Sequence, residues 1–296
     1  MQTVRDRRAL REGLIAVAAF ATTLPLTVIA LEGFPPLQLT FGRLMGASLF
    51  AICILWITHA PLPERHQFPG LLLVALGGVF GFPLLTAIAL AGREAAPAAI
   101  PLALIPLETA LWSRLRGHER PTPAFWLWAV AGSIVVLHFA WQSGASLAAP
   151  ELFFAGVSAS ISYAEGGRLA REMPGWQVMA WALVSAAPMI ALGFGYSWRS
   201  VNLPPTVQSW LALLLLALIS QFGAFWFWYR ALATGVSRTS QLQLLQPFFT
   251  LLLASILLGE TIAPKHWLYA AATAVAVQLA RTRRKRILQS VGEANP

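Results

Sequence analysis

Three polar side chains follow one another along one face of an apolar segment near the end of the sequence. Gln243, Gln246 and Thr250 are spaced by three and four residues, which puts them on the same side of a helix. Polar groups placed within a membrane tend to be functional. We therefore interpret this face as part of a substrate site, with helix–helix packing through the glutamines as the alternative.

Pro247 interrupts the same apolar segment, and Pro106 interrupts an earlier one. Pro247 stands about eight residues, or ~12 Å, from the start of its segment, close to the middle of a bilayer. Proline removes a helix hydrogen bond and leaves a carbonyl unpaired, which is tolerated where that carbonyl faces protein or a wet cavity. We expect these two helix breaks to form a substrate site between their helices.

Three ionisable side chains lie within apolar segments, where a charge is costly. Arg43 can pair with a substrate carboxylate; the alternatives are that its long stem carries the charge to the outer surface or that it pairs locally. Glu108 is a candidate proton carrier for coupled transport. Glu165 is a second candidate, although Arg168, three residues later, can pair with it.

Tyr163 and Gln221 lie within two further apolar segments. A tyrosine ring can stack on a substrate while its hydroxyl forms a hydrogen bond. Gln221 is deep enough in its segment to face a cavity. Both residues therefore join the predicted substrate site.

Other conspicuous residues are interpreted as architecture. Trp226 and Trp228 are typical of the aromatic belt at a membrane surface, and the alternative is that they gate the cavity together with Phe225 and Tyr229. The GxxxG spacing of Gly77 and Gly81 predicts close helix packing.

The sequence offers no enzyme active site. Its five histidines are scattered, Asp6 is the only aspartate, and no HExxH or GxSxG motif occurs. Cys53 is the only cysteine, so an intrachain disulfide and a cysteine metal cluster are excluded, and we interpret Cys53 as a buried apolar residue. We expect no catalysis, no cofactor and no metal.

The composition is that of a membrane protein. Of the 296 residues, 57% are hydrophobic and 11% charged, with a mean hydropathy of +0.65, whereas soluble domains carry about 25% charged residues. The net charge of +9 comes from short basic clusters between apolar runs. It therefore indicates orientation in a membrane rather than binding to nucleic acid.

Apolar runs of the length needed to cross a bilayer occur ten times. They lie near 13–31, 37–57, 68–91, 95–112, 123–141, 152–170, 176–197, 207–229, 239–258 and 266–280. The first is interpreted as a retained helix rather than a signal peptide. With the N-terminus inside, 17 of the 21 Lys and Arg residues fall on the inner side and 3 on the outer side. Both termini are therefore predicted to be cytoplasmic.

The second half of the sequence repeats the first. At a shift of 141 residues, 105–132 lies over 246–273, and the matched pairs include Pro106 with Pro247, Thr109 with Thr250 and Glu119 with Glu260. Five helices per copy is an odd number, so the second copy enters the membrane from the opposite side. Inverted repeats of this kind are typical of transporters with a site near the midplane.

The predicted fold is an all-α multi-pass membrane protein with ten transmembrane helices in two inverted five-helix repeats. The first repeat is expected at 1–144 and the second at 145–281, followed by a basic cytoplasmic tail at 282–296.

The motif LLGE at 257–260, followed by Pro264 and an apolar last helix, resembles the ten-helix, EamA-type branch of the drug/metabolite transporter superfamily. The resemblance covers the whole chain and is greatest to the aromatic amino acid exporters. It implies a central cavity surrounded by helices one to four and six to nine, with Phe82, Ser160 and Tyr163 in cavity-lining segments. The first repeat reads RGHE where the second reads LLGE. The sequence therefore leaves open whether the two corresponding helix ends, at opposite membrane surfaces, behave alike.

The candidate cavity residues are aromatic, amide and hydroxyl groups with Arg43 as the one cation. A phosphorylated substrate would need several Arg or Lys residues, whereas an organic cation would need a carboxylate beside aromatic rings, which Glu108 can supply. A zwitterion with a large apolar side chain fits best. The expected function is export of small zwitterionic metabolites, aromatic or bulky hydrophobic amino acids above all, by alternating access. The alternatives are export of other metabolites or organic cations, and a non-transporting scaffold or sensor.

Arg outnumbers Lys 19 to 2, and Ala and Leu abound, which indicates a GC-rich bacterial source and hence the inner membrane. The expected partners are a small-molecule substrate and the lipid bilayer, without nucleic acid, and the protein is expected to work as a monomer. Proton-coupled and facilitated transport are both compatible with the sequence.

Overall fold

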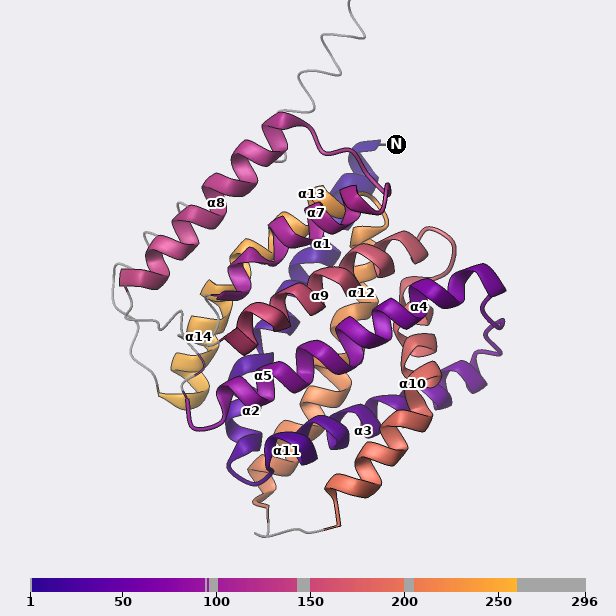
Figure 1. Ribbon diagram of the computed structural model, residues 1–296, viewed down its shortest axis with the longest axis vertical. Coiled ribbons are helices and arrows are strands. Elements are labelled where there is room, and N and C mark those ends of the chain that lie inside the picture. Colours follow the sequence, from indigo (N-terminus) through magenta and orange to yellow (C-terminus); the bar gives the residue numbers. More distant parts are fainter. Residues whose placement is uncertain (1, 94, 96–100, 143–149, 200–204, 260–296) are drawn as a thin grey trace, which may run out of the picture.

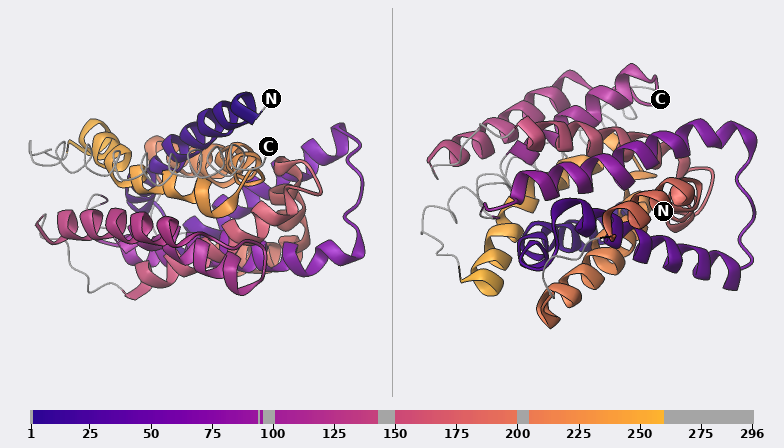
Figure 2. Two further views of the ribbon diagram at one scale, coloured as in Figure 1. Left: turned by 90° about the horizontal axis from the view of Figure 1, so that it is seen from above. Right: turned by 60° about the horizontal axis from the view of Figure 1, so that its bottom comes forward.

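The structure is a computed structural model that describes residues 2–93, 95, 101–142, 150–199 and 205–259, and within these residues it contains helices and no strand (Figure 1). The α-helices are α1 Gln2–Ala21, α2 Thr23–Leu31, α3 Pro36–Ile57, α4 Phe68–Val74, α5 Phe82–Leu90, α7 Ile105–Leu115, α8 Pro123–Gln142, α9 Pro150–Leu169, α10 Gly175–Ser197, α11 Val207–Leu215, α12 Ala224–Leu232, α13 Val236–Ser240 and α14 Gln246–Leu258. They form one bundle with α8 on its margin beside α7 (Figure 1 and Figure 2).

Within the part of the chain that the structure describes, six helical segments are long and apolar enough to cross a membrane. They are Arg7–Leu31, Pro36–Ile57, Arg65–Leu90, Gly175–Ser197, Val207–Leu232 and Val236–Leu258. Each of the first nine predicted spans overlaps helical residues, while the tenth, 266–280, lies outside the described residues. The count of ten spans and the orientation of the termini therefore stay predictions.

The first predicted span is divided in two. One continuous helix was expected near 13–31, but α1 ends at Ala21 and α2 starts at Thr23. The Thr22 hydroxyl donates a 2.7 Å hydrogen bond to the carbonyl of Ala19, and a threonine side chain that bonds its own backbone competes with regular helix geometry.

Departures from α-helical winding recur at one spacing. A π-helical segment at Ala75–Gly81 joins α4 to α5, and another at Leu216–Gly223 joins α11 to α12, so that their first residues are 141 positions apart. Short 3₁₀ segments, Pro101–Leu104 and Gln241–Leu245, precede α7 and α14, whose first residues are also 141 positions apart. This spacing equals the shift found in the sequence.

Proline accounts for the two 3₁₀ segments. Pro106 and Pro247 each stand at the second residue of the following α-helix. Because proline has no N–H, the carbonyl four residues earlier loses its helical partner, and the regular helix starts again at the proline. The predicted helix breaks thus occur at both prolines.

The first π-helical segment lies tightly against α9. A Cβ atom added to Gly77 would collide with the carbonyl oxygen of Ser158, and one added to Gly81 would crowd the Ser158 hydroxyl. The GxxxG spacing therefore permits the close packing that it predicts.

The lipid-facing surface corrects one expectation. Cys53 was expected to be buried, but it is exposed on α3. Large apolar residues on the same helix, among them Phe50 and Trp56, are exposed as well. In a membrane an apolar residue has no need to face the protein interior, because lipid solvates it.

Candidate functional site

A small enclosed cavity lies between helices of both halves of the chain. It is lined by Phe20 of α1, Arg43 of α3, Gly78 of the first π-helical segment, Phe82 of α5, Ala159 and Tyr163 of α9, Ser220 of the second π-helical segment and Phe225 of α12. Its volume is about 10 Å³, which leaves room for one water molecule in this conformation.

Arg43 supplies the positive charge of the cavity. The side chain is buried, with 3% of the residue exposed, and its Nη2 donates to the Ser220 hydroxyl at 3.1 Å. Ser220 is in turn 2.7 Å from the hydroxyl of Thr23 on α2. The Arg43 Nε has no hydrogen-bond partner, and no carboxylate of the described residues forms an ion pair with the guanidinium.

In this conformation the Arg43 side chain does not reach the surface, and it forms no ion pair with an acid among the described residues. A buried cation without a counter-charge is costly, so an anion that entered the cavity would find strong stabilisation there.

Aromatic rings form one wall of the cavity. The Phe20 ring lies 4.9 Å from that of Phe225 and 5.9 Å from that of Tyr163, centroid to centroid. Trp228 stands behind them, 5.4 Å from Tyr163. The Phe20–Phe225 and Tyr163–Trp228 pairs are edge-to-face and the Phe20–Tyr163 pair is tilted, and together the rings make an apolar surface.

Trp228 also corrects a prediction. It was expected in an aromatic belt at the membrane surface, but it is fully buried. A run of aromatic residues at the end of a helix has the same composition in a belt and in an internal cluster, so the sequence does not distinguish them. Trp226 is partly buried and lies 6.0 Å from the ring of Trp176.

The two π-helical segments meet beside the cavity. Gln221 in the second donates through Nε2 to the Gly78 carbonyl of the first at 3.1 Å. Its Oε1 is buried without a hydrogen-bond partner. A π-turn offsets backbone carbonyls from their regular partners, which is why such turns are frequent at functional sites. Gln221 thus contacts the cavity wall through Gly78 and keeps a buried acceptor without a partner.

The structure brings together only part of the predicted substrate site. Arg43, Phe82 and Tyr163 line the cavity. Gln243 is buried next to the Tyr163 hydroxyl, but neither its Nε2 nor its Oε1 meets the geometric criteria for a hydrogen bond. Gln246 and Thr250 are buried away from the lining, and Thr250 donates to the Ala21 carbonyl at 3.3 Å.

Phe20 and Ser220 were not among the predicted site residues, whereas Phe225 was named as part of an alternative gate to the cavity. Ser220 directly precedes Gln221, so the depth argument that selected the glutamine applies to it as well. Phe20 comes from the first helix, where alanines flank it on both sides, and no local signal distinguishes it from the other apolar residues there.

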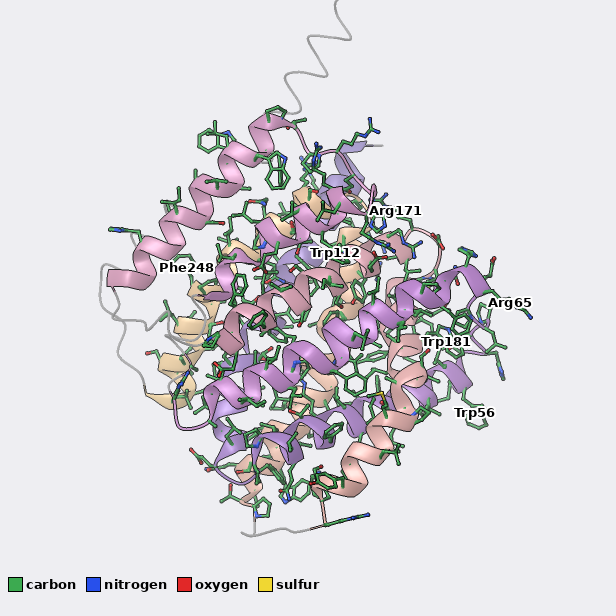
Figure 3. The ribbon with its side chains drawn as sticks, viewed as in Figure 1. Trp56, Arg65, Trp112, Arg171, Trp181 and Phe248 are labelled. Carbon is green, nitrogen blue, oxygen red and sulfur yellow. The ribbon has the colours of Figure 1, made fainter. Side chains whose placement is uncertain are left out.

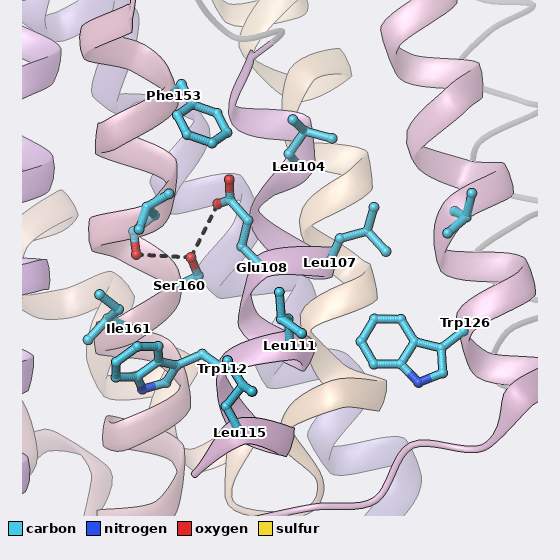
Figure 4. A pocket seen from close by; sticks show the side chains of 12 residues that line it. Leu104, Leu107, Glu108, Leu111, Trp112, Leu115, Trp126, Phe153, Ser160 and Ile161 are labelled. Carbon is cyan, nitrogen blue, oxygen red and sulfur yellow. Dashed lines mark hydrogen bonds between the residues drawn. The ribbon is translucent and has the colours of Figure 1, made fainter.

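Ser160 lies outside this cavity. It belongs to a second, larger pocket of about 480 Å³ between α7, α8 and α9, together with Glu108 (Figure 4). The Ser160 hydroxyl lies 3.2 Å from the Glu108 carboxylate. One helix, α9, thus separates the cavity around Arg43 from the pocket around Glu108.

Glu165 is held by ion pairs. Its fully buried carboxylate lies 2.8 Å from Nε of Arg116, 3.4 Å from Nε of Arg168 and 3.9 Å from Nε2 of His118. Burial lowers the pKa of His118, although the negative charge of Glu165 acts to raise it. The local pair with Arg168 predicted as the alternative is present, and Arg116 adds a closer one.

Further ion pairs lie near the turn after α9, where Figure 3 labels Arg171. Arg171 pairs with Glu119 at 2.9 Å, and Arg168 pairs with Glu172 at 2.9 Å. Among the described residues, no group of three or more histidines, cysteines, aspartates or glutamates is arranged to hold a metal ion.

Comparison with known proteins gives three findings. Residues 12–141 and 144–282 each match the EamA-like transporter family. The chain is 42% identical over 261 residues to the uncharacterized transporter YdeK of Bacillus subtilis (strain 168), covering 84% of this chain and 88% of YdeK. A crystal structure of a protein with 21% sequence identity has the same fold, with a TM-score of 0.73 over 94% of this chain and 98% of its own.

Proposed function

The chain belongs to the EamA-like transporter family, and from this premise we propose that it exports small zwitterionic metabolites, above all aromatic or bulky hydrophobic amino acids. The transporter itself is a multi-pass membrane protein. The substrate class and the direction of transport are the parts that we propose here.

The unpaired Arg43 in an aromatic cavity is the observation that carries this proposal. A guanidinium binds a carboxylate through paired hydrogen bonds, and its Nε has none at present. Beside it, Phe20, Tyr163 and Phe225 offer rings against which a large apolar side chain can pack. A carboxylate with a bulky apolar body satisfies both features.

The ammonium group of the substrate would be bound by neutral acceptors. Gln221, which is bonded to Gly78 of the cavity wall, has a buried Oε1 without a partner, and Tyr163 and Ser220 line the cavity. These neutral groups hold an ammonium less strongly than a protein carboxylate would. The carboxylate–Arg43 contact is therefore expected to dominate affinity.

Organic cations are a poor fit to this cavity. Its only charged lining residue is positive, so a cation would meet repulsion where an anion meets attraction. A non-transporting scaffold would have no use for such a site, and membership of a transporter family favours transport over a sensor.

Alternating access would supply the space that the cavity lacks in this conformation. The π-helical segments Ala75–Gly81 and Leu216–Gly223 each contribute one residue to the cavity lining, Gly78 and Ser220. Their spacing of 141 residues, together with the two consecutive family matches, supports two repeats of the same fold. We propose that these repeats are inverted and that their relative movement opens the cavity.

The excess of Lys and Arg on one side of the predicted topology supports cytoplasmic termini. The Bacillus relative supports a bacterial cytoplasmic membrane. We further propose that a single copy suffices for transport, because the cavity is lined by one chain.

Purified protein in liposomes loaded with unlabelled phenylalanine tests the proposal. We expect exchange of labelled phenylalanine, and slower exchange of threonine. Arg43→Gln should reduce exchange at least about tenfold, as expected for loss of a charge-assisted contact. The control Arg93→Gln removes an exposed arginine and should have no effect. Wild-type exchange by Arg43→Gln would refute the site, and repetition with a pH gradient separates coupled from facilitated transport.

A further inference from the structure

The pocket between α7, α8 and α9 is large enough for a small organic molecule. Its volume of about 480 Å³ lies within the range of ligand sites. The lining is almost wholly apolar and contains leucines, valines and the rings of Trp112, Trp126 and Phe153. Figure 4 shows Trp126 on α8 across the pocket from α9.

Glu108 is the only charged side chain that lines this pocket. Its carboxylate lies between Leu104 and Phe153 and points toward α9 (Figure 4). It forms no ion pair with any described residue. A carboxylate at this depth needs a counter-charge or a proton, because lipid and apolar side chains do not solvate it.

The one hydrogen bond of Glu108 is a shared one. The Ser160 hydroxyl lies 3.2 Å from the carboxylate, but it also lies 2.8 Å from the Gly156 carbonyl and 3.0 Å from the Val157 carbonyl. A hydroxyl has a single proton. The shorter contacts to the two carbonyls therefore leave Glu108 with little stabilisation from Ser160.

The pocket opens to the lipid side of the bundle. Leu111, Leu115 and Phe153, which line it, are exposed. The helix that forms its outer wall, α8, lies on the margin of the bundle (Figure 1). A molecule dissolved in the membrane can thus reach the carboxylate without passing through the central cavity.

We propose that this pocket binds a lipophilic organic cation, a protonated amine with an apolar body. The charge complements Glu108, and the indole faces of Trp112 and Trp126 can stabilise an ammonium group by cation–π contact. The apolar body takes the place of lipid against the leucines. This site prefers the opposite charge from the cavity around Arg43, so it does not depend on the proposed function.

Binding of a matched series of probes tests the site. The full-length protein in phosphatidylcholine nanodiscs is dialysed against 4-phenylbutylamine, 4-phenylbutan-1-ol or 4-phenylbutyrate, with empty nanodiscs to subtract partition into lipid. We expect saturable binding of the amine alone. Equal binding of the alcohol would make the pocket a neutral apolar groove and overturn the proposal.

Two variants locate the amine. Glu108→Gln should weaken its binding at least about tenfold, as for removal of one partner of a buried charge pair, whereas Glu32→Gln, at an exposed carboxylate, should not. Val130→Trp fills the pocket from the exposed side of α8 and should weaken binding with Glu108 in place. Unchanged binding in Glu108→Gln overturns the proposal.

The central cavity provides a further control. Arg43→Gln should leave amine binding unchanged while it reduces phenylalanine exchange at least about tenfold. Loss of amine binding in this variant would place the amine in the central cavity and overturn the assignment to the pocket around Glu108. Loss of phenylalanine exchange in Glu108→Gln with amine binding intact would also count against it.

Discussion

Glu119 and Val236 are joined by a 2.7 Å hydrogen bond, in which the carboxylate accepts the backbone N–H at the start of α13. The other carboxylate oxygen accepts the N–H of Ser237 at 2.8 Å, and Arg171 pairs with the same side chain at 2.9 Å. One residue in the loop after α7 thus ties the start of α13 to the turn after α9. In the proposed topology all three segments lie on the cytoplasmic side, and the contact closes that end.

Glu119→Gln should loosen this closure. The amide keeps one acceptor oxygen, but its NH₂ group would face the second backbone N–H, and the ion pair with Arg171 is lost. We expect the free energy of unfolding to fall by about 1–3 kcal/mol. Thermal unfolding of the purified protein measures the change, with the exposed Glu32→Gln as the control. Equal stability of the two variants would show that the contact does not hold the helices.

The sequence predicts a structural feature only where that feature depends on residues close together in the chain. The proline breaks at Pro106 and Pro247 follow from the missing N–H of one residue, and both occur where they were predicted. The partners of Arg43 could not be predicted, because Ser220 lies 177 residues away and Thr23 reaches it only through the fold. The same applies to the capping of α13 by Glu119.

The predicted stripe of Gln243, Gln246 and Thr250 shows a second limit. Helical spacing places residues on one face only if the helix is regular, but the 3₁₀ segment Gln241–Leu245 ends within the stripe. A 3₁₀ turn advances each residue by about 120° rather than 100°. The three side chains are all buried, yet the closed cavity does not include them.

Gly77 provides a test of the packing between the first π-helical segment and α9. Gly77→Leu would force a side chain into the backbone carbonyl of Ser158, which cannot move aside without distorting α9. We expect the free energy of unfolding to fall by at least about 1–3 kcal/mol. Gly195→Leu on α10 is the matched control, because a Cβ atom there meets nothing within 4 Å. Thermal unfolding of both proteins compares them, and equal midpoints would contradict the close contact.

Glu172 predicts a dependence of stability on acid pH. Burial opposes ionisation of this carboxylate, but hydrogen bonds from Gln67 and His66 and the charge of Arg168 outweigh it and lower its pKa below the ordinary 4.5. The folded state therefore binds this proton less readily than the unfolded chain. The stabilisation is present above pH 4.5 and is lost as the pH falls through the lowered value.

Glu172→Gln removes the titrating group and so separates its effect from the other carboxylates. The difference in unfolding temperature between wild type and this variant should be larger at pH 7 than at pH 3.5. A constant difference across this range would mean that Glu172 contributes no proton linkage. The hydrogen bonds from Gln67 and His66 would then stabilise the folded protein equally whether Glu172 is protonated or ionised.

Tyr163 and Gln246 offer the sharpest comparison within the proposed substrate site, because only the tyrosine lines the closed cavity. Tyr163→Ala removes a ring that packs between Phe20 and Trp228, so the KM for phenylalanine exchange should rise at least about tenfold. Tyr163→Phe keeps the ring and should change the KM by less. Gln246→Ala should leave the KM within about twofold if binding occurs before α14 moves. If Gln246→Ala were as impaired as Tyr163→Ala, the broken helix would form part of the substrate site during the transport cycle, as the sequence predicted.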